Sequence, residues 1–296
     1  MIEDGVRCAV AIGKFDGMHL GHIKLLEEIS SYKDEGFRSL VFTFESPISD
    51  FFTGEKSRVL TPLDEKRRLI KEAGIDYLYT MPVNKKTVSY DPEAFVRDIL
   101  VSKLKAGVIA AGEDLSFGDK GAGDMALLYR LSSEHGGDLD YRASKIEKVK
   151  YRGEDISSSL VRDAVSKGDM ERAGDMLGRA YSIEGEVLHG RMLGRTLGMP
   201  TANLIPAQDK LLPPFGVYAG EAEVGGRIYR GITNIGIKPT VKDDDTVVAE
   251  TYMLGLDHDI YGEVIRVSLK HFIRPEMKFE SLDALQDQMK KDLTEA

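Results

Sequence analysis

The segment GKFDGMHLGH, which starts at Gly13, combines two glycines with two histidines spaced three residues apart. It follows a short apolar run, Cys8 to Ile12, and precedes a stretch with helical spacing of apolar residues, so the pattern predicts a turn between a strand and a helix. Gly13 and Gly17 permit a sharp turn, and the helix start directs free N–H groups and the positive end of its dipole at a bound group. His19 and His22 can lie on the same side of that helix start and donate hydrogen bonds to one phosphate.

Other interpretations of the two histidines compete with a phosphate site. A zinc site would need a third and usually a fourth ligand at suitable spacing, and no Cys or further His lies nearby. The segment also lacks the GK[ST] of a P-loop and the GxGxxG fingerprint of dinucleotide-binding proteins. The remaining alternative is that one histidine caps the helix and the other belongs to the core, which is the common situation for an isolated histidine.

The segment GRTLGMPTANL is a second candidate site. Gly194 and Gly198 bring the backbone close to a ligand, Pro200 stiffens the turn, and Thr201 and Asn203 present two oxygen-bearing side chains two residues apart. Hard oxygen ligands of this kind suit Mg²⁺ that is shared with ATP phosphates. Taken alone, PTAN is an ordinary loop, so its significance depends on the motifs that follow it.

The first part of the chain has the pattern of an α/β domain. Up to about residue 145, short apolar runs alternate with amphipathic stretches, as in a parallel sheet with crossover helices. The helices are expected at LGHIKLLEEISSYKDEG and at TPLDEKRRLIKEAG, where Thr61 and Pro62 form a cap-and-proline start. The expected strands are Cys8 to Ile12, Ser39 to Phe44, Tyr77 to Met81 and Gly107 to Ala111.

The second part changes character after a helical stretch from Ile156 to Leu177. Alternation with a period of two in SIEGEVLHG, GVYAGEAEV, VVAETYML and EVIRVSLKHFI predicts antiparallel β-structure, with a hairpin turn at Gly225-Gly226. The last segment returns to helical spacing after a cap at Ser281. The chain of 296 residues exceeds the roughly 100–200 residues of a usual domain, so we expect two domains, 1–180 and 181–296.

The composition excludes several classes of protein. No segment approaches the roughly 18 uninterrupted apolar residues of a membrane span. The acidic N-terminus lacks the features of a secretory signal, and the single cysteine, Cys8, cannot form an internal disulfide, so we expect a cytoplasmic protein. A net charge of −9 argues against a nucleic-acid binder. We expect small-molecule substrates and a monomer or weak homo-oligomer.

The first motif, G-x-F-D-G-x-H-x-G-H, resembles the signature of the HxGH nucleotidyltransferases, which transfer a nucleotidyl group from a nucleoside triphosphate and release pyrophosphate. The resemblance implies a later phosphate motif at another helix start, and ISSSLVR is similar to it; alone, this serine run would be a simple cap. Its serines supply hydroxyls and amides, and its arginine supplies a charged fork. The implied ATP and phosphate site consists of Gly13, Phe15, Asp16, Gly17, His19, His22, Ser157, Ser158, Ser159 and Arg162.

The segment AAGEDLSFGDKGAGD resembles the GxDFxFG segment of bacterial FAD synthetases. The resemblance implies a nucleotide and flavin pocket that includes Gly112, Asp114, Phe117 and Gly118. The chain departs from the family pattern at Leu115 and Ser116 and at Ser46 to Ile48, where the family usually continues with Pro-His-Pro. Because the chain contains no Trp, any stacking on the isoalloxazine must come from Phe or Tyr.

The motifs that follow PTAN resemble riboflavin kinase across the whole C-terminal part, a small β-barrel that phosphorylates the ribityl 5′-hydroxyl with MgATP. They are GVY, NIGIKPTV, the strand with Glu250, DIYGE and FIRPEMKF. The chain departs from the family pattern at Lys238, in place of a common arginine, and at Gly255, where an aspartate is usual before DIYG. The resemblance implies that Glu250 is the general base and that Arg274 contacts the flavin or orders the C-terminal helix. It also implies that Thr201 and Asn203 bind Mg²⁺. The residues implied to bind ATP or flavin are Gly194, Gly198, Pro200, Thr201 and Asn203.

Together the two parts resemble the bifunctional bacterial riboflavin kinase/FAD synthetase family. The implied fold is an N-terminal Rossmann-like α/β domain followed by an antiparallel β-barrel and a C-terminal helix. The implied reactions are riboflavin to FMN and FMN to FAD, each with MgATP, with Glu250, His19, His22 and Arg162 as catalytic residues. Two alternatives remain: a riboflavin kinase with a weak or differently specific adenylyltransferase, or a non-enzymatic flavin-binding regulator.

Overall fold

The computed structural model describes residues 2, 5–188, 200–238 and 246–295. The chain divides into two compact units, Met1–Ser157 and Ser158–Ala296. The expected boundary near residue 180 lies beyond two helices that this division assigns to the second unit, and as a domain boundary it stays a prediction. Within the described ranges, no helix is long and apolar enough to cross a membrane.

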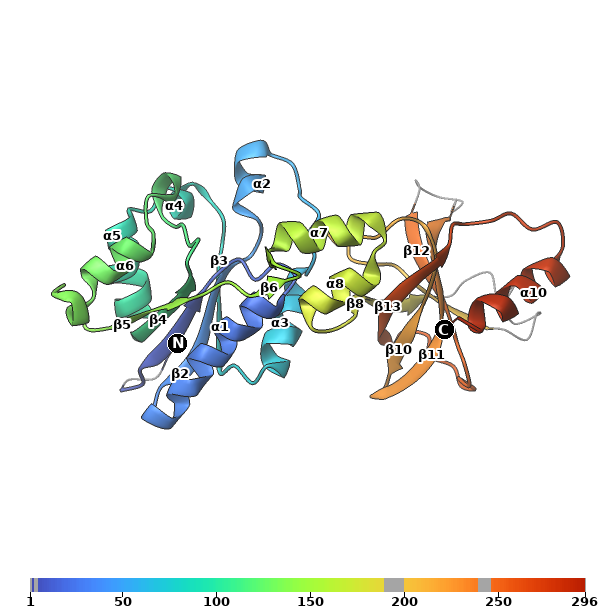
Figure 1. Ribbon diagram of the computed structural model, residues 1–296, viewed down its shortest axis with the longest axis horizontal. Coiled ribbons are helices and arrows are strands. Elements are labelled where there is room, and N and C mark those ends of the chain that lie inside the picture. Colours follow the sequence, from blue (N-terminus) through green and yellow to red (C-terminus); the bar gives the residue numbers. More distant parts are fainter. Residues whose placement is uncertain (1, 3–4, 189–199, 239–245, 296) are drawn as a thin grey trace. The chain divides into compact units, whose positions relative to one another are not determined.

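The first unit is built on a five-stranded parallel sheet with the order β3-β2-β1-β4-β5 (Figure 1). The four expected strands are confirmed, whereas β5 was not predicted because its sequence, RASKI, contains no apolar run and is only partly buried. The strands are β1 Cys8–Ile12, β2 Arg38–Phe44, β3 Tyr77–Met81, β4 Ala106–Gly112 and β5 Arg142–Ile146.

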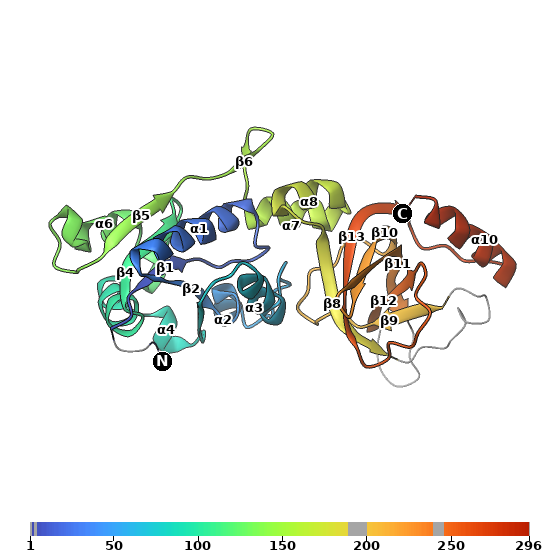
Figure 2. The same cartoon turned by 90° about the horizontal axis from the view of Figure 1, so that it is seen from below.

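Helices cover both faces of this sheet (Figures 1 and 2). The helices of this unit are α1 Leu20–Ser31, α2 Ile48–Thr53, α3 Leu63–Glu72, α4 Lys85–Val88, α5 Pro92–Ala94, the π-helix η2 Phe95–Lys103 and α6 Met125–Leu131. Residues of α1 and α3 pack in one core cluster, and residues of η2 and α6 pack in the other. Short 3₁₀ turns lie at η1 Tyr32–Glu35, η3 Asp119–Gly121 and η4 Ser133–His135, and a hairpin is formed by β6 Lys150–Tyr151 and β7 Glu154–Asp155.

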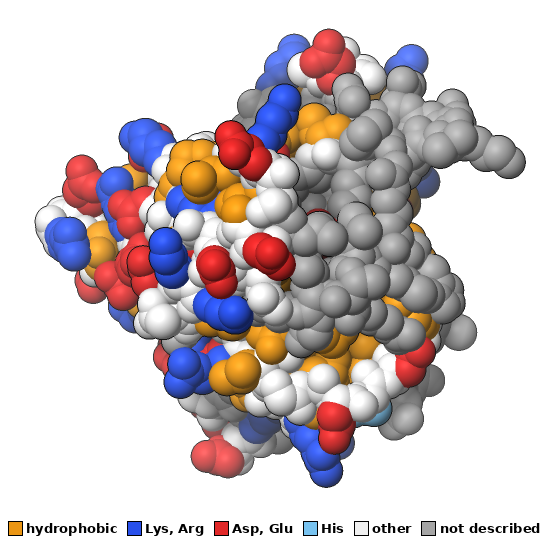
Figure 3. Space-filling view, turned by 90° about the vertical axis from the view of Figure 1, so that its right-hand side faces the viewer, with side chains coloured by type: hydrophobic (Ala, Val, Ile, Leu, Met, Phe, Trp, Pro, Cys, Tyr) orange, Lys and Arg blue, Asp and Glu red, His pale blue; other side chains and the backbone are white. Residues whose placement is uncertain are grey.

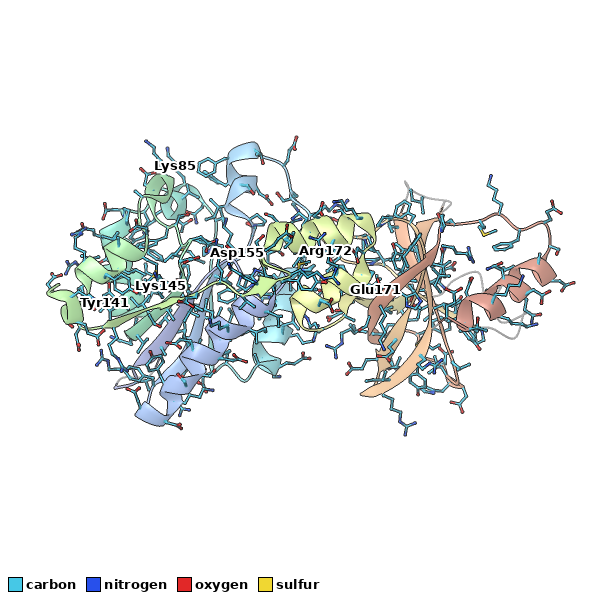
Figure 4. The ribbon with its side chains drawn as sticks, viewed as in Figure 1. Lys85, Tyr141, Lys145, Asp155, Glu171 and Arg172 are labelled. Atoms are coloured by element: carbon cyan, nitrogen blue, oxygen red, sulfur yellow. The ribbon has the colours of Figure 1, made fainter. Side chains whose placement is uncertain are left out.

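Strand β1 is buried at every position because its side chains alternate between two hydrophobic clusters. Ala9 and Ala11 pack in the cluster that includes the apolar residues of α1 and Ile70 of α3. Val10 packs in the other cluster, which includes residues of η2 and α6. On that second face Tyr141 (Figure 4) is fully buried, and its hydroxyl donates to the carbonyl of Leu128 in α6 at 2.5 Å.

The second unit contains a closed antiparallel barrel with the order β10-β11-β12-β9-β8-β13, which confirms the expected barrel and C-terminal helix. Its elements are α7 Ser158–Lys167, α8 Met170–Leu177, β8 Tyr181–Leu188, β9 Thr201–Leu204, β10 Gly216–Val224, β11 Arg227–Lys238, β12 Thr246–Met253, β13 Val264–Arg274 and α10 Leu282–Leu293. The hairpin at Gly225-Gly226 is confirmed, since both residues have positive φ and Val224 pairs with Arg227. Ser281 caps α10 by accepting from the amide of Ala284.

The expectation of one helical stretch from Ile156 to Leu177 was wrong in one respect, because this part of the chain forms two helices, α7 and α8. The first helix ends before Gly168, where φ is +76°, and Asp169 caps the second helix by accepting from the amide of Arg172.

Glycines explain the close packing of the barrel strands. A Cβ at Gly220 or Gly231 would collide with a carbonyl oxygen of the neighbouring strand, so the strands could not approach as they do.

Candidate active sites

The carboxyl edge of the parallel sheet brings together three loops that the sequence separates. The loops that follow β2, β1 and β4 begin at this edge, and these three strands are neighbours in the sheet. In open α/β sheets ligands bind outside the carboxyl ends of the strands. Three segments therefore lie at the carboxyl edge of the sheet. They are GKFDGMHLGH, the Ser46 to Ile48 segment that departs from the family pattern, and the loop from Gly112 to Gly118.

The loop between β1 and α1 has an unusual backbone. Phe15, Gly17 and Met18 all have positive φ, of 50°, 86° and 48°. Positive φ is uncommon for residues other than glycine, and it costs free energy that the surrounding structure must offset. The Phe15 and Met18 side chains are fully buried in the cluster beneath α1, so packing supplies part of that stabilisation.

The two imidazoles lie against each other at the start of α1. Their ring centroids are 3.8 Å apart with 26° between the planes, which confirms the expectation that His19 and His22 share one side of the helix start. His19 occupies the N-cap position, where its carbonyl accepts from the amide of His22, but its side chain makes no capping bond. Gly21 leaves room for this arrangement, because a Cβ there would come within 3.2 Å of the His19 ring.

Thr61 was expected to cap α3, and this prediction was wrong. The helix begins at Leu63 with Pro62 at the N-cap position. The Thr61 hydroxyl instead accepts from the amide of Gly17 at 2.9 Å, and the Thr61 amide donates to Oδ1 of Asp16 at 3.0 Å. Asp16 therefore helps to hold the histidine loop through its carboxylate.

Lys66 is a second residue of α3 that contacts the histidine loop and that was not predicted. Its Nζ donates to the carbonyl of Lys14 at 2.8 Å, and the same carbonyl accepts from the Thr43 hydroxyl at 3.1 Å. Lys66 is only 8% exposed, and this burial lowers the pKa of its ammonium group below the usual value. The nearby Asp16 carboxylate offsets part of the decrease. The sequence signal for this contact was a charged pair, Glu65-Lys66, on the buried side of an amphipathic helix.

The loop after β4 is held mainly by its own packing. Phe117 is buried against Phe95, with ring centroids 5.4 Å apart, and it exchanges two backbone hydrogen bonds with Gly123. Gly118 has a φ of +73° and packs so closely on Pro92 that a side chain would not fit. These contacts give the two residues structural roles, and their membership of a nucleotide or flavin pocket stays a prediction.

Asp114 of the same loop is tied to the chain that leads out of β5. Lys148 lies 3.7 Å from a carboxylate oxygen of Asp114 and 3.7 Å from one of Asp155. Gly112 ends β4 and is close to Asp114, since a Cβ there would lie 3.1 Å from its Oδ1. The Asp114 carboxylate thus already has a cationic neighbour.

The ISSSLVR motif lies at a helix start, as expected. α7 begins at Ser158, and Arg162 lies one turn further along, partly exposed. Ser157 belongs to the first unit, whereas Ser158, Ser159 and Arg162 belong to the second. Their proximity to His19 and His22 therefore stays a prediction.

The segment that departs from the family pattern, Ser46 to Ile48, leads into α2, with Pro47 at the N-cap position. This short helix carries two exposed aromatic side chains, Phe51 at 42% and Phe52 at 71%, with ring centroids 5.4 Å apart. Exposed aromatic rings at the carboxyl edge of an α/β sheet are candidates for stacking on a planar ligand.

In the barrel, three polar residues lie side by side on neighbouring strands. Glu250 of β12 pairs in register with Asn203 of β9 on one side and with Asn234 of β11 on the other. All three are partly exposed, while Thr251, the next residue along β12, is buried and contacts Thr233 at 3.0 Å. Because strand side chains alternate, the row lies on the outer face of the barrel.

Thr201 lies two residues before Asn203 on the same face of β9, opposite Tyr252. Thr201 and Asn203 thus present their oxygens along one face, as the sequence predicted. Pro200 is exposed just before the strand, and Gly194 and Gly198 lie outside the described residues.

A second glutamate, Glu276, contacts this row and was not predicted. Nδ2 of Asn234 donates to Oε1 of Glu276 at 3.2 Å. The Glu276 carboxylate packs over Gly236, where a Cβ would collide with it. The sequence signal is the FIRPEMKF motif, in which the resemblance assigns a role to Arg274 alone.

Arg274 orders the C-terminal helix. Its guanidinium donates to both carboxylate oxygens of Asp292 in α10, at distances of 2.8 to 3.1 Å. This is one of the two roles expected for Arg274, and the flavin contact stays a prediction.

Comparison with known families agrees with the division into two parts. A model of the FAD synthetase family matches residues 2–160, and a model of the riboflavin kinase family matches residues 177–296. Both matches lie on the parts whose folds are described above, so the single-activity and regulatory alternatives are not favoured.

Curated relatives match nearly the whole chain. Proteins named bifunctional riboflavin kinase/FMN adenylyltransferase from Listeria monocytogenes and Bacillus subtilis are each 35% identical, over 96% and 99% of this chain and 89% and 93% of their own. The protein of that name from Escherichia coli K12 is 36% identical over 96% of this chain and 90% of its own. A crystal structure described as a macrolide-efflux protein from Streptococcus pneumoniae matches with a TM-score of 0.84 and 28% identity, over 98% of this chain and 94% of that one. The chain therefore belongs to the family of bifunctional riboflavin kinase/FMN adenylyltransferases.

Proposed function

We propose that this bifunctional enzyme adenylylates FMN at the loop from Gly13 to His22 and phosphorylates riboflavin on the outer face of the barrel around Glu250. The stacked imidazoles at the start of α1 carry the first assignment, since two N–H donors at a helix N-terminus suit a reacting phosphate. The row of Asn203, Glu250 and Asn234 supports the second.

In the adenylyltransferase reaction, an FMN phosphate oxygen attacks the α-phosphorus of ATP, and pyrophosphate leaves. His19 and His22 donate hydrogen bonds to phosphate oxygens as negative charge builds on them. Arg162, Ser158 and Ser159 add donors from the start of α7. The exposed ring of Phe52 is proposed to stack on the isoalloxazine.

In the kinase reaction, Glu250 accepts the proton of the ribityl 5′-hydroxyl while the hydroxyl oxygen attacks the γ-phosphorus and ADP leaves. Phosphoryl transfer depends chiefly on positioning and charge stabilisation, so one base with well-placed oxygen ligands is a sufficient set.

Mg²⁺ is proposed to bind Thr201 and Asn203 together with ATP phosphates, where it would neutralise phosphate charge. The donor set fits, because hydroxyl and amide oxygens along one strand face are hard ligands. Among the described residues, no group of three or more His, Cys, Asp or Glu residues could hold a metal.

We further propose that the enzyme acts in the cytoplasm, where ATP is abundant, as a monomer or weak homo-oligomer, and without nucleic acid or membrane. The net charge of −9 supports the absence of nucleic acid. Among the described side chains on the face seen in Figure 3, positive and negative groups are interspersed. Light scattering would test the oligomeric state.

The deciding experiment is to incubate the purified protein with riboflavin, ATP and Mg²⁺ and to separate the flavins by chromatography. Both FMN and FAD should form, and chelation of Mg²⁺ should stop both reactions. FMN alone would contradict a working adenylyltransferase site, and undiminished turnover after chelation would contradict the proposed metal.

A further inference from the structure

The start of α3 is an element that holds the loop with the two histidines, together with β2, whose Thr43 also contacts this loop. The segment from Thr61 to Lys66, at the start of α3, makes three hydrogen bonds to it: Thr61 accepts from Gly17 and donates to Asp16, and Lys66 donates to the carbonyl of Lys14. These contacts extend along the loop from Lys14 to Gly17.

The loop needs this support because its backbone is strained. Phe15 and Met18 have positive φ on either side of Gly17, and such a conformation persists only when the surroundings determine it. The Thr61 hydroxyl contacts the amide of Gly17 between these two strained positions. A shift at Gly17 would therefore move His19, which follows two residues later at the start of α1.

Lys66 fixes the other end of the loop. Together with the Thr43 hydroxyl, it satisfies the carbonyl of Lys14, two residues after the end of β1. Both donors are buried, so this junction is shielded from water. A lysine is rarely buried unless it has partners, and here its partners belong to the histidine loop.

We propose that Thr61 and Lys66 are positioning residues of the adenylyltransferase reaction, which hold the loop in the shape that brings His19 and His22 onto the reacting phosphate. The inference rests on the proposed assignment of FMN adenylylation to this loop. Neither residue needs to touch the substrate. Their effect is on geometry, and misplacement of a reacting group by about 1 Å can cost a factor of about 100 in rate.

The test uses the full chain, in which the riboflavin kinase reaction is an internal control. Thr61→Val removes the hydroxyl acceptor, Thr61→Ser keeps it, Lys66→Met removes the donor, and Lys71→Met removes an exposed lysine of the same helix. For each variant, kcat and KM for ATP and FMN are measured in FAD formation, together with riboflavin phosphorylation and the thermal unfolding curve.

Thr61→Val and Lys66→Met should lower the kcat of FAD formation at least tenfold, with KM for ATP changed by less than about threefold and riboflavin phosphorylation unchanged. Thr61→Ser should restore most of the kcat, and Lys71→Met should behave as the unaltered protein. A normal kcat in both Thr61→Val and Lys66→Met would overturn the proposal. So would a loss that merely follows the fraction of unfolded N-terminal unit, because it would assign the residues to stability alone.

His22→Ala distinguishes failure of this inference from failure of the site assignment. If His22→Ala loses FAD formation while the Thr61 and Lys66 variants keep it, the positioning role is wrong and the site stands. If His22→Ala keeps FAD formation, the site assignment itself is wrong, and the inference falls with it.

Discussion

Arg274 and Asp292 form a buried bidentate ion pair that joins the last barrel strand to the C-terminal helix. The Asp292 side chain is 1% exposed and that of Arg274 is 14% exposed, and Gln288 donates a further hydrogen bond to Asp292 at 2.8 Å. The arginine comes from FIRPEMKF, so a motif that resembles part of a kinase site also anchors α10.

Asp292→Ala should destabilise the C-terminal unit strongly, because it leaves the Arg274 guanidinium buried without its partner. Breaking a buried ion pair by removing one member typically costs about 3–5 kcal/mol. Denaturant unfolding, followed by the loss of riboflavin phosphorylation, measures the change. Asp287→Ala is the matched control, since the Asp287 side chain is 71% exposed in the same helix and its ion pair should contribute less than about 1 kcal/mol. Equal midpoints for the two variants would contradict this role of the pair.

Glu250→Gln should block FMN formation yet still allow FAD to form from supplied FMN. The amide keeps the size of the side chain but cannot accept the hydroxyl proton, and loss of a general base typically lowers the rate about 10²–10⁴-fold. Chromatography of the flavins separates the two reactions in one sample. Substantial riboflavin phosphorylation by this variant would rule out Glu250 as the base.

His22→Ala should have the reverse effect and stop the pathway at FMN. Removing one preorganised donor to a charged reacting group typically costs about 10²–10³ in kcat. The imidazole also stacks on His19, so the loss should exceed that of a single exposed hydrogen bond. Release of pyrophosphate from FMN and ATP is the measurement, with riboflavin phosphorylation as the control. FAD output at the normal rate would show that the opening motif has another role.

The fold was predictable where local pattern and tertiary environment agree. β1 and β3 have the expected bounds, β2 begins one residue earlier than expected, and β4 is one residue longer at each end. β1, β2 and β4 are interior strands with continuous apolar runs, which a buried parallel strand requires. β5 was not predicted because its sequence, RASKI, lacks the apolar and aromatic residues that indicate the other edge strand, β3, whose sequence is YLYTM.

The site was predictable for residues whose spacing carries the chemistry, and not for residues that act across the fold. His19 and His22 meet because they are three apart on one helix start. Thr61 was predicted to cap a helix because a Thr-Pro pair is a local cap signal. Its hydroxyl instead accepts a hydrogen bond from the amide of Gly17, 44 residues earlier. Lys66 and Glu276 were missed for the same reason, since neither lies in the motif that it supports.

The contact between Glu276 and Asn234 leads to a prediction for the kinase site. Gly236→Ala should displace the Glu276 carboxylate, because the new methyl group would occupy its position over β11. The carboxylate is the end of a flexible side chain and can move aside, so the loss of stability should be small. The hydrogen bond to Asn234, the neighbour of Glu250, would be broken.

Riboflavin phosphorylation by Gly236→Ala should therefore fall several-fold, while FAD formation from supplied FMN and the unfolding midpoint stay the same. Glu276→Ala should cause a similar loss, and the double variant should lose no more than either single one, because both changes remove one interaction. Steady-state kinetics of the three variants completes this cycle. Additive losses would show that Gly236 and Glu276 act independently, and full activity in Glu276→Ala would show that Asn234 needs no carboxylate partner.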